Sequence, residues 1–310
     1  MSILSVVGAL IPVFLIILTG MVLKRFTLFD EGAWRSFENL CYYLLFPVLL
    51  IKTLATAEIG ATQVASFSAA LLFAIVSMSL LLLLFYPLLR RRFGVEPPVF
   101  TSIFQGATRW HGFIALSIVG LLYGDEGVTY MAITMAVIIP PLNVVNVWVL
   151  AHFGRGESHF RQVLEKLLKN PFIIACGIGA LLNLSGIGLS GAVYSVFDIL
   201  GGGALGLGLL TVGASLNIRL ALERRVLVVF GALLRLLGMP ALMLFGCWIF
   251  DIQGMARMVA IIAGAVPTAA SSFIFARQMG GDAPLMANLI TVQVLLAMFT
   301  LPLVMWLGTL

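Results

Sequence analysis

Charged residues are scarce in this sequence, and those present fall in short clusters. Only 10% of the 310 residues are Asp, Glu, Lys or Arg, whereas 61% are hydrophobic. A soluble domain usually carries about 25% charged residues, so this composition excludes an ordinary soluble protein. Between the clusters lie apolar runs long enough to cross roughly 30 Å of hydrocarbon. The sequence therefore predicts an all-α integral membrane protein without a soluble domain.

Residues and motifs of several other functions are also few or absent. Cys41, Cys176 and Cys247 all lie in apolar runs and indicate neither a disulfide framework nor a metal site. No GxxxxGK(S/T) motif is present, so we expect no direct use of ATP and no cofactor. The GxSxG and HExxH motifs of hydrolases are missing as well. No basic patch with interleaved aromatic residues accompanies the net charge of +5, and we expect no nucleic-acid partner.

Ten apolar segments are expected to span the membrane. They are 4–22, 37–51, 65–89, 99–122, 128–150, 171–187, 192–216, 226–250, 258–276 and 285–307. Lys24 and Arg25 follow the first segment and no basic residue precedes it, so we expect a retained span and not a cleaved signal peptide.

The basic residues predict the orientation of the chain. Cytoplasmic loops of membrane proteins carry an excess of Lys and Arg. Fourteen of the 18 basic residues fall in the odd-numbered loops: Lys24, Arg25, Arg35, Arg90, Arg91, Arg92, Arg155, Arg161, Lys166, Lys169, Arg219, Arg224, Arg225 and Arg277. The even-numbered loops hold only Lys52 and Arg257. We therefore expect a multi-pass protein of the cytoplasmic (inner) membrane with both termini on the non-cytoplasmic side.

The two halves of the chain resemble each other. The polar stretch 154–170 separates a first five-helix repeat, 1–153, from a second, 171–310, and is expected to form a cytoplasmic linker helix. A nearly constant offset of 157 to 159 residues pairs Pro12 with Pro171, Gly20 with Gly179, Ser36 with Ser195, Asn39 with Asp198, Gly106 with Gly264, and Gly124 with Gly281. Five spans per repeat give the halves opposite orientations, which is the inverted-repeat architecture of many secondary transporters.

Two equivalent spans carry features that interrupt a helix. The fourth span contains GATRWHG at 106–112, which places three large polar or aromatic residues between glycines. In the ninth span, Pro267 removes a backbone donor and clashes with the preceding turn. A helix broken inside the membrane must line a protein or water-filled cavity. The N-terminal ends of the resumed helices carry partial positive charge, so with Arg109 they predict an anion-binding site near the midplane.

The candidate substrate-binding residues are Arg109, Trp110, His111, Gly112, Pro267, Thr268, Ser271, Ser272, Asn39 and Asn143. His111, Glu38 and Asp198 are candidates for proton or ion coupling, His111 because imidazole changes its charge near physiological pH.

Structural roles stay open for several of these polar residues. An arginine costs about 2.5–3.5 kcal/mol at the bilayer centre, so Arg109 needs a partner. That partner could be Glu38, Asp198, the carbonyls of a broken helix or a bound anion. Arg235 is expected to be structural or to snorkel to the interface. Buried amides such as Asn143, Asn146 and Gln293 more often join helices than bind ligands.

With these motifs in view, the sequence resembles the auxin efflux carrier family of bacterial and plant transporters. The resemblance rests on FQGATRWHGFIALSIVGLLYGDEG, KNPFIIACGIGALLNLSGI, LLTVGASL and PTAASSFIFARQMGGD, in this order. It implies ten helices, with helices four and nine broken and crossing, and transport of small organic anions such as dicarboxylates. In the family an Asn usually follows the Arg of the fourth span; here His111, or alternatively Trp110, is expected to take its position, and Ser271 stands where the family often has a second Asn.

The leading hypothesis is a secondary carrier of small carboxylates that works by alternating access. One alternative is a sodium-coupled symporter of the bile-acid-transporter type. The other is an intramembrane hydrolase that would use Ser271 or Ser272 with His111. The lipid bilayer and a small organic anion are the expected partners, and the oligomeric state, a homodimer included, is left open.

Overall fold

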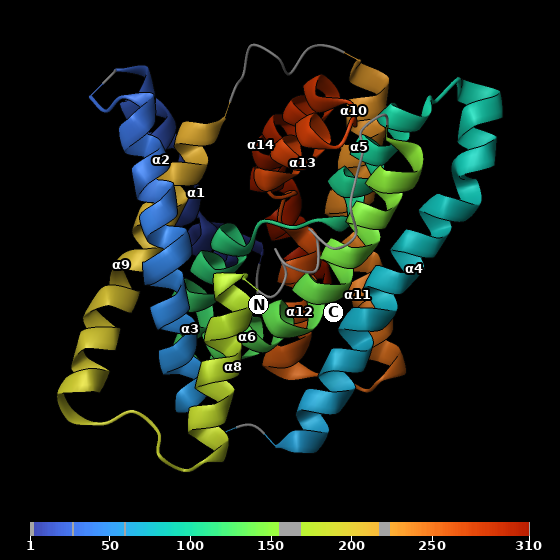
Figure 1. Cartoon of the computed structure of the whole chain (residues 1–310). Coiled ribbons are helices and arrows are strands. Elements are labelled where there is room, and N and C mark those ends of the chain that lie inside the picture. The colour runs from blue at the N-terminus through green and yellow to red at the C-terminus, as the bar shows by residue number, and fades with distance from the viewer. Residues whose placement is uncertain (1–2, 27, 59, 155–168, 217–223, 310) are drawn as a thin grey trace. The chain divides into compact units, whose positions relative to one another are not determined.

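The computed structural model describes residues 3–26, 28–58, 60–154, 169–216 and 224–309. Every regular element within these ranges is a helix, which confirms the all-α prediction (Figure 1). The elements are α1 (Ile3–Arg25), α2 (Glu31–Leu40), η1 (Cys41–Leu45), α3 (Phe46–Ala55), α4 (Ala61–Phe93), α5 (Pro97–Thr108), α6 (Gly112–Phe153), α8 (Pro171–Leu184), α9 (Gly191–Ser215), α10 (Arg225–Leu233), η3 (Leu234–Gly238), α11 (Met239–Ile249), α12 (Gly254–Ala265), α13 (Ser271–Gln278) and α14 (Ala283–Leu307).

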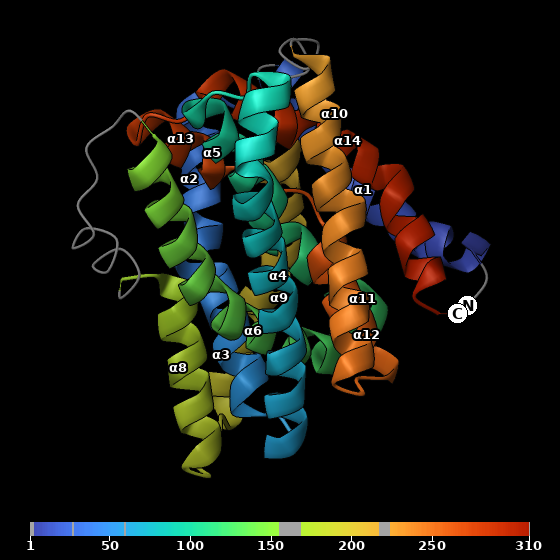
Figure 2. The same cartoon turned by 90° about the vertical axis from the view of Figure 1, so that its right-hand side faces the viewer.

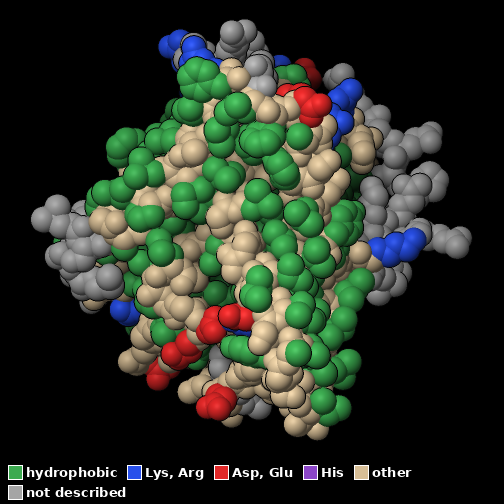
Figure 3. Space-filling view, turned by 90° about the vertical axis from the view of Figure 1, so that its left-hand side faces the viewer, with side chains coloured by type: hydrophobic (Ala, Val, Ile, Leu, Met, Phe, Trp, Pro, Cys, Tyr) green, Lys and Arg blue, Asp and Glu red, His purple; other side chains and the backbone are tan. Residues whose placement is uncertain are grey.

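The surface is that of a membrane protein. Seven described helical segments are long and apolar enough to cross a membrane, and α8 and α12 are shorter apolar helices. Leu184, Ile199 and Leu84 are 84%, 77% and 74% exposed. Hydrophobic side chains cover the centre of the face drawn in Figure 3, and most of its charged side chains lie towards the edges. Such a surface is unfavourable in water and suits a hydrocarbon solvent.

The chain forms two compact units that do not coincide with its sequence halves. Unit 1 consists of Met1–Ala65, Gly112–Ala136 and Leu168–Leu216, and unit 2 of Ser66–His111, Val137–Leu167 and Asn217–Leu310. Each unit therefore draws on both halves, and α6 passes from one unit to the other. The predicted linker helix, 154–170, lies almost entirely outside the described residues.

In unit 1, α1 packs against α9, and α3 packs against α8 and α9. The contact between α1 and α9 is close because Gly213 lies directly against the backbone of Ile17, where a Cβ atom would overlap the Ile17 carbonyl. The predicted span 37–51 proves longer, since helical structure runs from Glu31 to Ala55 through the π-helical segment η1. Its start is set by Asp30, whose Oδ1 accepts the Ala33 N–H at 2.6 Å.

In unit 2, α5 packs against α10, α13 and α14. Figure 2 shows α13 beside α5. The helical conformation is interrupted twice, between Thr108 and Gly112 and between Ala265 and Ser271. Pro267 contributes to the second interruption because a residue before proline is driven into the extended conformation, and Val266 has φ −70° and ψ 152°. Both interruptions fall where the sequence predicts them.

One loop assignment in this unit is wrong. Arg257, expected in a loop, lies half-buried on α12 and donates through Nη2 to the Gly308 carbonyl at 2.7 Å. The residue stands one turn into a helix that begins earlier than the predicted span, so its long side chain can reach the end of α14.

Candidate functional site

The two helix interruptions meet within unit 2. The His111 N–H donates to the Pro267 carbonyl at 2.8 Å, which joins the two extended segments directly. Each preceding helix is closed by a backbone bond of its own, from Arg109 N–H to the Gln105 carbonyl at 2.9 Å and from Val266 N–H to the Ile262 carbonyl at 3.0 Å. The backbone groups released by the interruptions are thus partly paired across them, as an apolar surrounding requires.

Arg109 contacts Asn143, Ser271 and Phe275 at this junction. Its Nη1 donates to Asn143 Oδ1 at 3.2 Å, and its Nη2 donates to Ser271 Oγ at 3.1 Å. The guanidinium carbon lies 4.6 Å from the centre of the Phe275 ring, within cation–π distance. These three partners orient the guanidinium plane.

The N-terminal end of α13 adds to the positive potential beside Arg109. Ser271 is the first residue of α13 and is exposed. The first turn of a helix carries about half a positive charge, and here the Ser272 and Phe273 N–H groups already donate to the carbonyls of Ala269 and Ala270. An anion beside Ser271 could therefore interact with both the guanidinium and this helix end.

The other predicted residues of the ninth span face the interior. Thr268 and Ser272 are both 0% exposed. Thr268 Oγ1 contacts the Gln105 carbonyl at 3.2 Å and Ser272 Oγ at 3.5 Å. The Thr268 hydroxyl thus links α5 to the segment before α13, and Ser271 is the predicted site residue of the ninth span that faces outward.

The predicted site residues divide between the two units. Unit 2 holds Arg109, Trp110, His111, Asn143, Pro267, Thr268, Ser271 and Ser272, whereas unit 1 holds Gly112, Asn39, Glu38 and Asp198. Trp110 and His111 are buried, with 7% of each exposed, while Glu38 and Asn39 are exposed on α2. Arg109 is brought into direct contact with Asn143 and with Ser271.

Two interior residues behind the interruptions tie them together. Arg235 on η3 is only 1% exposed, so the snorkelling interpretation is wrong and the structural one is supported. Gln293 on α14 joins helices as expected. Its Oε1 accepts the Thr268 N–H at 2.8 Å, and its Nε2 donates to the carbonyls of Gly106 at 3.0 Å and Gly231 at 3.3 Å.

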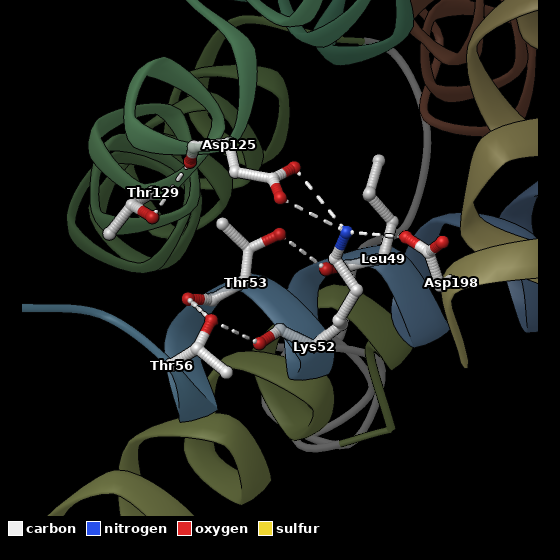
Figure 4. A network of polar contacts seen from close by, with 7 residues as sticks. All are labelled: Leu49, Lys52, Thr53, Thr56, Asp125, Thr129 and Asp198. Carbon is white, nitrogen blue, oxygen red and sulfur yellow. Dashed lines mark hydrogen bonds and ion pairs between the residues drawn. The ribbon is translucent and has the colours of Figure 1, made fainter. Parts of the chain in front are cut away.

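Unit 1 contains a charged cluster that the sequence did not predict (Figure 4). Lys52 was expected in a loop, but it lies on α3 with 6% of its side chain exposed. Its Nζ is 2.9 Å from Asp198 Oδ1 on α9 and 3.3 Å from both oxygens of Asp125 on α6. The sequence left Asp198 open as a partner of Arg109, but in the structure Asp198 is paired with Lys52. The sequence feature that could have indicated a buried Lys52 is the apolar segment FPVLLIKTLA, which surrounds it with hydrophobic residues.

These features define a multi-pass helical membrane protein with a cationic group at an interrupted helix. A family model described as "Membrane transport protein" matches residues 5–153 and 156–305. The chain therefore belongs to this family, the auxin efflux carrier family, as its motifs indicated. No curated protein matches the chain. Members of the family are transporters, so membership favours transport over the hydrolase and does not favour the sodium symporter.

Proposed function

We propose that the protein is a secondary carrier of small organic anions, with carboxylates as the substrate class, and that it works by alternating access. The observation that carries this proposal is the Arg109 guanidinium, held at a helix interruption by Asn143 and Ser271. A carboxylate matches the planar fork of a guanidinium in shape and charge. Family membership supports the transport part of the proposal, and the positive charge of Arg109 supports the preference for anions.

The proposed architecture is ten membrane spans in two inverted repeats. Support comes from unit 1, where α1 packs against α9 and α3 packs against α8. At the offset of 159 residues, α1 is equivalent to α8 and the α3 region to α9, so each of these pairs is the repeat counterpart of the other. The interruptions before Gly112 and Ser271 also occupy equivalent positions. We further propose that the broken helices cross near the midplane.

His111 and Glu38 remain the proposed coupling residues, with Asn39 and Gly112 as further proposed site residues. Asp198 is a weaker coupling candidate, because binding a proton or an ion would require it to leave Lys52. Uptake into proteoliposomes under imposed proton and sodium gradients would distinguish the two coupling modes from uniport.

The test of the proposed function is carboxylate binding to purified Arg109→Ala, with thermal stability recorded alongside. We expect at least a tenfold loss of affinity, about 1.4 kcal/mol, since hydrogen bonds to charged groups contribute roughly 1.5–3 kcal/mol. Arg109→Lys should lose less because it keeps a point charge.

Arg277→Ala is the matched control, since Arg277 is an exposed arginine on the same helix as Ser271. It should bind as the wild type does. Unchanged affinity in a stable Arg109→Ala protein would remove Arg109 from the site. Turnover of a peptide or ester in detergent would favour the hydrolase instead.

A further inference from the structure

Among the described residues of unit 2, Arg235 has the largest fully buried side chain, and it reaches the ends of two helices. Its Nε donates to the Val266 carbonyl at 2.7 Å and its Nη2 to the Ala263 carbonyl at 2.6 Å, both at the C-terminal end of α12. Its Nη1 contacts the Ala107 carbonyl in the last turn of α5 at 3.5 Å. The π-helical segment η3 carries the residue, and such wide turns are frequent at functional sites.

The ends that Arg235 contacts are those that would attract cations. The last carbonyls of a helix carry about half a negative charge, and α5 and α12 both end beside the Arg109 junction. Without a compensating charge, these two ends would oppose the binding of an anion. A single buried guanidinium offsets both.

The geometry of the junction has a second support that carries no charge. Gln293 binds the Thr268 N–H and the Gly106 carbonyl, so it holds the same two segments by neutral hydrogen bonds. Gln293 therefore still holds the two segments when Arg235 is replaced, so the charge of Arg235 can be tested by comparing a neutral and a charged replacement.

We propose that Arg235 is a positioning residue that sets the charge selectivity of the anion site by neutralising the C-terminal ends of α5 and α12. Arg235 acts by binding the backbone carbonyls at these helix ends and does not touch the substrate. The inference rests on the proposed function and adds to it that Arg235 raises the preference of the site for a dianion over a monoanion of the same size. Without Arg235, the negative helix ends would repel each ligand charge, so the free energy of binding would weaken twice as much for a dianion as for a monoanion.

The experiment measures the affinities of succinate and of its monoamide, succinamate, at a pH at which succinate is fully ionised. The informative quantity is the ratio of the two affinities in wild type, Arg235→Gln and Arg235→Lys. We expect Arg235→Gln to lower the preference for succinate by at least about threefold. Arg235→Lys keeps the charge with fewer hydrogen bonds, so its ratio should stay at the wild-type value even if its stability falls.

Arg257→Gln is the matched control, because Arg257 also donates to a carbonyl at a helix end in unit 2, that of Gly308. Its affinity ratio should not change. Equal weakening of both ligands in Arg235→Gln would show a structural role only and overturn the inference. If Arg235→Gln fails to fold, a lowered ratio in Arg235→Lys overturns it as well.

Failure of the inference can be distinguished from failure of the proposed function. Wild-type protein that binds neither ligand contradicts both. If wild type binds both ligands, Arg109→Ala loses them and Arg235→Gln keeps the wild-type ratio, the carrier proposal stands and the role of Arg235 falls.

Discussion

At the residue scale, the ion pairs of Lys52 show that the free-energy cost of losing the partner can differ between the two members of a pair. Its side chain is 6% exposed, whereas those of Asp125 and Asp198 are 68% and 56% exposed. The carboxylates can be hydrated without their partner, but the ammonium cannot. Breaking a buried ion pair is costly chiefly because it leaves a buried charge uncompensated, so the carboxylates matter here because they compensate the lysine.

This asymmetry predicts the order of stability of three variants. Asp125→Asn combined with Asp198→Asn should destabilise the protein by about 3–5 kcal/mol, because it leaves the buried ammonium without a counter-charge. Lys52→Met should cost less, and adding it to the double variant should restore part of the lost stability. Thermal unfolding measures all three. Lys24→Met is the control, since the Lys24–Glu31 pair is exposed and should contribute little. A triple variant less stable than the double one would contradict the argument.

The residue scale also shows why part of the site was predictable. Arg109, Ser271 and Asn143 stand out because polar groups inside apolar spans require partners or a function. The partners themselves were not predictable in the same way. Lys52 meets carboxylates 73 and 146 positions along the chain, and no local pattern encodes such pairs. For Arg235 the sequence indicated a structural or a snorkelling role, but not that backbone carbonyls would bind its guanidinium.

At the scale of elements, the packing of α1 on α9 depends on the absence of a side chain at Gly213. We predict that Gly213→Ala lowers the free energy of unfolding by about 1–3 kcal/mol, because the new Cβ would overlap the Ile17 carbonyl and force the helices apart. Thermal unfolding in detergent gives the measurement.

Gly206→Ala, on the same helix, is the control for this substitution. A Cβ at Gly206 meets nothing within 4 Å, so only helix propensity changes, and that favours alanine by about 1 kcal/mol. The variant should be as stable as the wild type or more so. Equal destabilisation by both substitutions would mean that close packing of α1 on α9 is not the cause.

The composition predicted that the elements are helices, and the positions of glycine and proline predicted where two of them are interrupted. The residues at which the helices begin and end were not predicted as well. The segment from Glu31 to Ala55 exceeds its predicted span at both ends because Asp30 caps it and Lys52 is accommodated inside the unit. Hydropathy marks where a helix becomes polar. It does not mark where the helix stops, since a polar residue with a buried partner can continue it.

The orientation of the whole molecule is still a prediction from charge. Because most basic residues fall in the odd-numbered loops, we expect both termini on the non-cytoplasmic side. A reporter active only in the cytoplasm should be silent when fused after Leu310 and active when fused after Arg92. Activity at Leu310 with silence at Arg92 would mean the opposite orientation.

The interleaving of the two compact units has a consequence for how the protein is made. The chain passes between the units at residues 65–66, 111–112, 136–137, 167–168 and 216–217. During synthesis unit 1 is complete only when Leu216 has emerged, and unit 2 only at the C-terminus, although domains generally fold as units in the order of synthesis. Tyr86 of α4 and Phe100 of α5 pack on Phe153 at the end of α6, but α5 must wait in the bilayer for α10, α13 and α14, which are translated more than a hundred residues later. No single truncation point would release either unit as an autonomous fragment.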